Sequence, residues 1–209
     1  MVVYRGPGPS GGTTQLWLRR WDDLDAAPVR GTVGAGAPSV SPDGRELAFA
    51  QGSEIKVLAF EGGPIRTLTT GTWPRWGPDG YIYASVPGGT VRVSVTGGPA
   101  DTVTQFTGDD AFHIIFDFLP GGESALLHIN LPGGEFEARA VDLATGEMKP
   151  LMFGTVPQYA STGHLVVVDG TLMAAPFDPK AVELLGPAVA LVDGVGSHAM
   201  SRTGSPSRT

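Results

Sequence analysis

Carboxylates are the first residues in this 209-residue chain to consider for catalysis, because glycoside hydrolysis needs two of them flanking the scissile bond. Asp117 follows an apolar run and occupies a position that recurs along the chain. The recurring position reads Ser39, Arg75, Asp117 and Gln158. Since none of the other three is a carboxylate, the sequence predicts no catalytic pair at this position.

The remaining aspartates fit structural uses better than catalytic ones. Asp43 and Asp79 each stand before a glycine in a Pro-Asp-Gly turn, where the side chain bonds to backbone two residues further on. Asp22, Asp23 and Asp25 form a local cluster, but a calcium site needs six to eight oxygens at organised spacing. We therefore expect two turn residues and a solvated loop, and no metal site.

Other catalytic signatures are also missing from the sequence. The four histidines are scattered without metal-ligand spacing, at His113, His128, His164 and His198. The chain has no Gly-x-Ser-x-Gly elbow, and it lacks the glycine-rich loop, His-Arg-Asp and Asp-Phe-Gly motifs of protein kinases. We predict no catalytic residue and no cofactor within this chain, so an enzymatic activity would need another domain.

The composition excludes several classes of protein and argues against some kinds of partner. The chain has no cysteine, which excludes a disulfide scaffold, and its net charge of -7 argues against nucleic acid as a partner. No apolar run approaches the roughly 18 to 20 residues that span a bilayer, so we expect no membrane insertion. No signal peptide is visible. We expect a cytoplasmic location as encoded, or an extracytoplasmic one if the chain belongs to a larger anchored or secreted protein.

The strands that position these residues are predicted by a repeat in the sequence. Glycine-containing turns end at Gly44, Gly80, Gly122, Gly163 and Gly204, so successive glycines are 36, 42, 41 and 41 residues apart. With 31 glycines and 18 prolines cutting the chain into strand-sized runs, a period of about 40 residues is typical of four-stranded propeller blades. The sequence predicts an all-β protein, a β-propeller of four-stranded antiparallel blades.

The run before each turn is expected to be the first, innermost strand of a blade. An apolar column precedes the turns, at Val40, Trp76, Phe118, Tyr159 and Met200. One residue earlier stands the polar column of Ser39, Arg75, Asp117 and Gln158, with Ala199 as its fifth member. Because side chains alternate along a strand, the two columns face opposite sides. We predict that the four polar residues line the propeller channel as ligand-binding candidates.

The repeat resembles that of TolB-type, WD-repeat-like propellers. Residues 41–50 with 61–69 match its pattern of Ser-Pro-Asp-Gly, an apolar strand and a Gly-Gly turn before Arg-x-Leu-Thr. Later units depart from it, with Gly121 and Thr162 in place of the turn aspartate. Residues 162–187 resemble, more narrowly, the propellers that follow bacterial Ser/Thr kinase domains. That resemblance implies a sensing or interaction role.

The ends of the chain suggest a composite blade. Residues 1–5, 15–21 and 27–32 read as strands two to four of a blade, and residues 196–204 read as its first strand. A single domain over residues 1–209 would then hold five blades, four continuous and one built from both termini. Its units would be residues 1–32 with 196–205, then 33–70, 71–107, 108–155 and 156–195. The alternative is a fragment of a ring of six or more blades.

These patterns favour a non-catalytic interaction propeller. We expect a sensor or scaffold module of a larger bacterial protein, such as a Ser/Thr kinase, that acts as a monomer and binds a protein or small molecule at the channel mouth. The alternatives are an accessory, substrate-gating propeller of a peptidase and, after that, a five-bladed glycosidase. Peptidases with similar propellers keep their catalytic serine in a separate domain, so the first alternative also needs no catalytic residue here.

Overall fold

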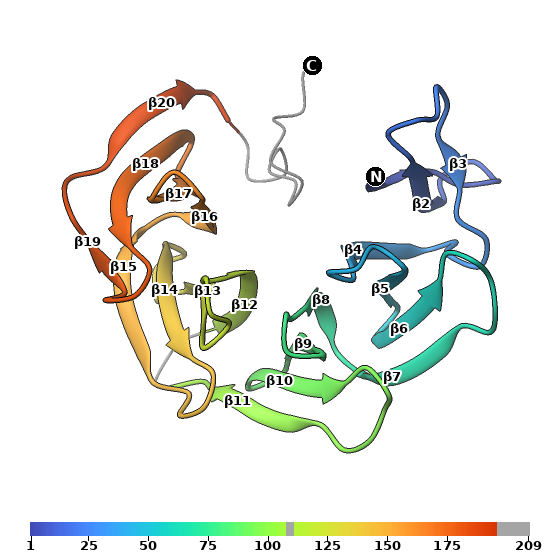
Figure 1. Cartoon of the computed structure of the whole chain (residues 1–209), viewed down its shortest axis with the longest axis horizontal. Coiled ribbons are helices and arrows are strands. Elements are labelled where there is room, and N and C mark those ends of the chain that lie inside the picture. Colours follow the sequence, from blue (N-terminus) through green and yellow to red (C-terminus); the bar gives the residue numbers. More distant parts are fainter. Residues whose placement is uncertain (108–110, 196–209) are drawn as a thin grey trace. The chain divides into compact units, whose positions relative to one another are not determined.

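The computed structural model describes residues 1–107 and 111–195, and every regular element in these ranges is a β-strand. The strands form five sheets, which are the blades of a β-propeller fold (Figure 1). The predicted all-β, antiparallel propeller class is thus confirmed. Within the described ranges, no helix exists that is long and apolar enough to cross a bilayer.

The sheets follow one another along the chain. The first contains β1 (Val2–Pro7), β2 (Thr14–Arg19) and β3 (Ala27–Pro28). The second contains β4 (Ala35–Val40), β5 (Glu46–Gln51), β6 (Glu54–Ala59) and β7 (Arg66–Thr70). The third contains β8 (Thr72–Trp76), β9 (Tyr81–Val86), β10 (Gly89–Ser94) and β11 (Asp101–Gln105). The fourth contains β12 (Ala111–Phe118), β13 (Ser124–Asn130), β14 (Phe136–Asp142) and β15 (Met148–Phe153). The fifth contains β16 (Thr155–Ala160), β17 (His164–Val168), β18 (Thr171–Asp178), β19 (Glu183–Leu184) and β20 (Val189–Asp193).

The first and fifth sheets differ from the regular pattern. The first has three described strands, and the further strand expected from residues 196–205 lies outside the described residues. In the fifth, β20 pairs with the first half of β18, while β19 pairs with Phe177 and Asp178 at the end of the same strand. Two short strands therefore share one edge of β18.

The chain divides into two compact units. The first contains residues 1–87 and 91–102, and the second contains residues 88–90 and the chain from Val103 onward. The division runs through the third sheet, since the start of β10 and the end of β11 belong to the second unit. The expectation of a single domain over residues 1–209 stays a prediction.

The turn after β4 shows why the Ser-Pro-Asp-Gly sequence ends one strand and starts the next. The Asp43 carboxylate accepts hydrogen bonds from the Ser41 hydroxyl (2.6 Å) and the Arg45 amide (3.1 Å). Gly44 has a φ of 72° and donates its amide to the Ser41 carbonyl (2.9 Å). A residue with a side chain enters this left-handed region at a cost, so glycine fixes the position of the turn.

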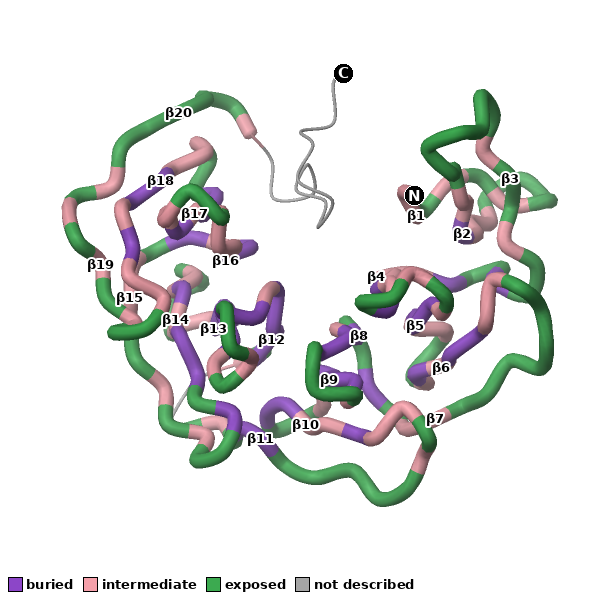
Figure 2. The backbone as a smooth tube through the Cα atoms, viewed as in Figure 1, coloured by how far each residue is buried: buried purple, intermediate pink, exposed green. Residues whose placement is uncertain are grey.

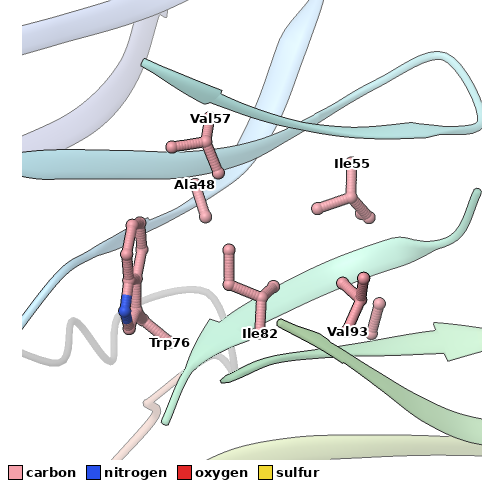
Figure 3. Packing of buried hydrophobic residues seen from close by; sticks show 7 residues of the cluster. Ala48, Ile55, Val57, Trp76, Ile82 and Val93 are labelled. Carbon is pink, nitrogen blue, oxygen red and sulfur yellow. The ribbon is translucent and has the colours of Figure 1, made fainter. Parts of the chain in front are cut away.

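Buried side chains connect neighbouring sheets within each unit. Between the second and third sheets lies a cluster in which Ala48, Ile55 and Val57 meet Trp76, Ile82, Ala84 and Val93 (Figure 3). The alternate residues of β5, Leu47 and Phe49, pack with Leu16 of the first sheet. A strand with apolar residues on both faces is thus explained by a neighbouring sheet on each side.

The second unit repeats this arrangement between the fourth and fifth sheets. There Leu126, Ala138 and Ala140 pack with Leu165, Val167 and Phe177. The cores of the two units therefore use the same strands of the blade, with the second and third strands of one sheet covered by the following sheet. This regularity places the first strands of successive sheets in equivalent positions.

Candidate functional site

The first strand of each complete sheet is interrupted by a shift in its pairing with the second strand. In each of these strands the shift near the start of the strand contains a non-glycine residue in the left-handed region: Ala37 (φ 47°), Trp73 (φ 51°), Phe112 (φ 54°) and Val156 (φ 52°). In three of the four cases a proline follows, and proline has no amide hydrogen for the ladder. The shift is therefore a property of the repeat.

The side chains at these positions differ in size and exposure. In the first unit, Trp73 is 45% exposed, and in the second unit Phe112 is 58% exposed. Val156 is buried, and Ala37 offers only a methyl group. A left-handed backbone costs an L-residue about 1 to 2 kcal/mol, and a bulky exposed aromatic recovers little of that by packing. Strained positions of this kind cluster at functional sites, which makes Trp73 and Phe112 binding candidates.

The predicted polar column has a structural task in both units. The buried Ser39 hydroxyl accepts a hydrogen bond from the amide of Trp76 in the next first strand (2.9 Å). Asp117 does the same two repeats further along the chain, since its Oδ2 accepts a hydrogen bond from the amide of Tyr159 (3.0 Å). Each bond ties one sheet to the first strand of the following sheet and satisfies an edge amide that the ladder leaves free.

Asp117 also accepts a hydrogen bond at Oδ1 from the amide of Phe118, its own neighbour (3.0 Å). The column member of the preceding repeat is Arg75, whose guanidinium carries donors only and has no acceptor to offer an amide. Asp117 therefore has an acceptor for each of two backbone amides. Arg75 and Gln158 are half-buried on β8 and β16, and the predicted ligand-binding role of all four residues stays a prediction.

The turn aspartates behave as expected from the sequence. The hydrogen bond from the Ser41 hydroxyl, followed by the one from the Arg45 amide, lowers the pKa of Asp43. Asp79 accepts hydrogen bonds from the amide of Tyr81 (3.2 Å) and the phenol of Tyr83 (2.7 Å). Burial, together with this bond to Asp79, raises the pKa of Tyr83. Both carboxylates therefore have structural partners.

The three described histidines lie in different surroundings in the second unit. His113 is fully buried, and its Nδ1 lies 2.8 Å from the hydroxyl of Thr104. His128 lies between the rings of Phe116 and Phe136, with centroids at 4.7 and 4.9 Å, and burial lowers its pKa to about 4. His164 is near Thr162 at a strand end, and His198 lies outside the described residues.

No group of three or more His, Cys, Asp or Glu side chains in residues 1–107 and 111–195 is arranged to hold a metal ion. Sequence reasoning did not single out Trp73 or Phe112. For Trp73 a signal was present, because the Trp73-Pro74 dipeptide inside an expected strand indicates a bulge. Phe112 is followed by His113 and gives no such signal.

Solved structures with the same fold belong to proteins of several activities. TolB from Acinetobacter baumannii is 20% identical, with a TM-score of 0.64 over 80% of this chain and 47% of its own. A puromycin-hydrolyzing peptidase from Mycobacterium tuberculosis is 15% identical, with a TM-score of 0.61 over 91% of this chain and 36% of its own. Oligogalacturonate lyase from Vibrio parahaemolyticus is 12% identical, with a TM-score of 0.61 over 86% of this chain and 60% of its own.

At these identities the similarity shows the fold, the β-propeller of TolB-type proteins. The chain spans less than two thirds of the length of each of the three structures. No protein-family model matches the sequence, and the comparison with curated proteins found no relative.

Proposed function

We propose that this TolB-type propeller fold serves as a non-catalytic binding module, and that its ligand contacts the chain where the first strands begin. The observation that supports this most directly is the exposure of Trp73 and Phe112 at left-handed backbone positions. Aromatic rings supply large contact areas with few rotatable bonds, which is why they are enriched in binding surfaces. Each ring is a candidate contact by itself, Trp73 in the first unit and Phe112 in the second, and the ligand is a protein or a small molecule with an apolar group that such a ring can cover.

The roles of the carboxylates support the same proposal. Asp117 accepts hydrogen bonds from two backbone amides, and Asp43 and Asp79 organise turns. The carboxylate oxygens of these residues accept hydrogen bonds from the backbone, which is a structural task. The binding proposal therefore uses these residues as scaffold and the exposed aromatics as contacts.

The larger context is part of the proposal. We infer that the module belongs to a bacterial sensor or scaffold protein, and a Ser/Thr kinase is the specific candidate because residues 162–187 resemble kinase-associated propellers. The chain spans 47% of the TolB structure, so a longer polypeptide is consistent with the fold. This part of the proposal rests on resemblance and is tested separately, by reading the coding sequence on either side for a kinase domain.

A second candidate function is that of an accessory propeller in a peptidase. The specific observation in its favour is the similarity to the puromycin-hydrolyzing peptidase, of which this chain covers 36%. In that role the propeller would admit substrate to a hydrolase domain outside these 209 residues. A hydrolase domain encoded next to this chain would favour this candidate over the kinase-associated one.

Photo-crosslinking in bacterial cells tests the binding proposal. p-Benzoylphenylalanine is placed at position 73 or 112, and at position 21 as the matched control, since Trp21 is also an exposed aromatic but lies in a loop without left-handed strain. We expect a discrete adduct from positions 73 and 112 and none from position 21. Equal labelling at all three positions would contradict the assignment of the binding surface.

An activity assay tests the non-catalytic part of the proposal. The purified chain is incubated with puromycin and with oligogalacturonate, the compounds named for two structures of the same fold. We expect no turnover of either. Turnover that is lost in Asp117→Ala, while the variant still unfolds cooperatively, would establish an enzyme and overturn the proposal.

A further inference from the structure

The surplus of negative charge lies in the second unit. The described residues of this unit contain ten Asp and Glu residues but only three Lys and Arg residues, whereas the first unit contains nine of each kind. Two of the three cations are paired, since Arg139 bonds to Glu137 (2.5 Å) and Lys149 to Glu183 (3.1 Å). The electrostatic field of the second unit therefore attracts positively charged partners.

Aromatic side chains gather at one end of the fourth sheet, where β12 and β14 begin and β13 and β15 end. Phe112 is 58% exposed at the start of β12, and Phe153 is 56% exposed at the end of β15. Phe136 is half-buried at the start of β14. Figure 2 shows the exposed colour in the connection between β13 and β14, at the same end. We call Phe112, Phe136 and Phe153 the aromatic end of this sheet.

Strand pairing places these rings in order across the sheet. Asn130 of β13 pairs with Phe136 of β14 and with the residue before Phe112 in β12. The Phe136 carbonyl accepts a hydrogen bond from the amide of the residue after Phe153 (2.8 Å). Since neighbouring strands lie about 4.8 Å apart and β12 and β15 are the outer strands of this sheet, Phe112 and Phe153 are attached about 14 Å apart.

Two exposed carboxylates lie beside these rings. Glu135 directly precedes Phe136, and Asp169 follows the last residue of β17 in the fifth sheet. That end of β17 touches the aromatic end, because a Cβ atom on Gly154 would be 3.3 Å from the Val168 carbonyl. Neither carboxylate forms an ion pair in the part of the chain that the structure describes. Ring, carboxylate, ring and carboxylate therefore follow one another within the second unit.

Two buried polar atoms at this end have no hydrogen-bond partner among the described residues. They are Oδ1 of Asn130 and Nδ1 of His128. His128 is 7% exposed and lies between the rings of Phe116 and Phe136. An amide oxygen accepts hydrogen bonds, and a buried acceptor without a donor is costly. A ligand that brings N–H groups to the aromatic end supplies donors of the kind that Asn130 lacks.

We propose that the aromatic end, together with Glu135 and Asp169, binds a basic peptide segment of a partner protein. The inference rests on the binding function proposed for Phe112 and names the chemistry of the ligand there. Lysine or arginine side chains complement the two carboxylates, and the faces of aromatic rings attract cations as well as apolar groups. The backbone N–H groups of a peptide are donors for a buried acceptor.

The spacing of the rings favours a peptide over a small amine. An extended peptide rises about 3.3 Å per residue, so the distance of about 14 Å between the two attachment points corresponds to about four residues. Alternate side chains of an extended chain point to the same side. Apolar residues at the first and fifth positions and basic residues at the third and seventh therefore match the order of rings and carboxylates. A small amine reaches one ring and one carboxylate only.

Isothermal titration calorimetry with the full chain tests the inference. The probe is the peptide acetyl-Leu-Ser-Lys-Ser-Leu-Ser-Lys-amide, and the comparison peptide carries glutamate in place of both lysines. We expect the basic peptide to bind, with an affinity that falls as salt is raised because screening weakens exposed ion pairs, and the acidic peptide not to bind. No heat of binding from the basic peptide, or an equal affinity for the two peptides, overturns the inference.

Matched variants locate the contact. Glu135→Gln is expected to weaken peptide binding about two- to fivefold at low salt, the range of an exposed ion pair. Glu147→Gln removes the same charge at the opposite end of the same sheet and is expected to leave binding unchanged. Phe153→Ser should weaken binding about fivefold or more, and Phe153→Gln replaces it if circular dichroism shows that the serine variant is unfolded. Equal effects of Glu135→Gln and Glu147→Gln would overturn the assignment to this end.

Photo-crosslinking separates a failure of this inference from a failure of the binding function. With p-benzoylphenylalanine at position 112, the adduct should weaken about fivefold or more when Glu135→Gln and Asp169→Ser are combined, while the adduct from position 73, in the first unit, persists. An undiminished adduct at position 112 overturns the basic segment and leaves the binding function intact. A missing adduct counts against the binding function, and the calorimetric result then decides on the basic segment by itself.

Discussion

Replacing Asp117 with alanine tests the idea that one carboxylate fastens the fourth sheet to the fifth. The change removes the acceptor for the Tyr159 amide at 3.0 Å and the acceptor for the Phe118 amide at 3.0 Å. A buried amide left without an acceptor costs about 1 to 3 kcal/mol. Phe118 is buried, whereas Tyr159 is half-buried, so water can replace part of the second bond.

We therefore expect Asp117→Ala to lower the free energy of unfolding by about 2 to 4 kcal/mol. That is a large share of the roughly 5 to 15 kcal/mol that a folded domain has. Asp117→Asn keeps one oxygen but turns an NH₂ group toward the other amide, so its effect should lie between the wild type and the alanine variant. Ser39→Ala removes the single bond to the Trp76 amide and should cost about 1 to 3 kcal/mol.

Urea unfolding can follow the two units separately, because all four tryptophans, at positions 17, 21, 73 and 76, belong to the first unit. Tryptophan fluorescence therefore reports the first unit, and far-ultraviolet circular dichroism reports both. Asp117→Ala should move the transition seen by dichroism more than the one seen by fluorescence, and Ser39→Ala should move the fluorescence transition. An Asp117→Ala variant within about 0.5 kcal/mol of the wild type, the usual range for a surface substitution, would refute the reasoning.

Two further changes test local features. Ala37→Gly removes a left-handed strain of about 1 to 2 kcal/mol and adds a backbone entropy cost of about 0.5 to 1 kcal/mol, so urea unfolding should show no loss and up to about 1.5 kcal/mol of gain. Ala48→Gly in the buried β5 is the control and should destabilise; equal losses in both would contradict the strain. His128 has a pKa of about 4 when folded and 6.5 as its ordinary value, so between these pH values the unfolded chain binds a proton that the folded chain does not. Stability should fall by up to about 3 kcal/mol as pH drops from 6.5 to 4, and in His128→Phe this part of the pH dependence should vanish; an unchanged pH dependence would count against burial as the cause.

The turns were predictable because their chemistry is local. Ser41, Asp43 and Gly44 are within four residues of one another, and their hydrogen bonds follow from side-chain length and glycine's access to positive φ. The fold class followed from the same turns through their spacing. The sequence also placed Ser39 and Asp117 at equivalent positions of the repeat, in the first strands of their blades.

What the sequence did not reveal depends on contacts between repeats. The hydrogen bond from the Trp76 amide to Ser39 joins residues 37 positions apart, and the residues near Ser39 in the sequence do not predict this partner. Exposure of Trp73 and Phe112 was missed because aromatic residues in a strand are ordinarily assigned to the core.

The left-handed residue of each first strand has a consequence for how such a chain changes over evolutionary time. Its backbone conformation is the same with alanine, tryptophan, phenylalanine or valine, as positions 37, 73, 112 and 156 show. The backbone conformation at this position therefore does not depend on the side chain. A substitution changes the side chain that the strand presents and leaves the path of the strand unchanged. Gene duplication of a blade would copy the conformation and leave the side chain free to diverge, so the surface can differ from one repeat to the next while the strand stays the same.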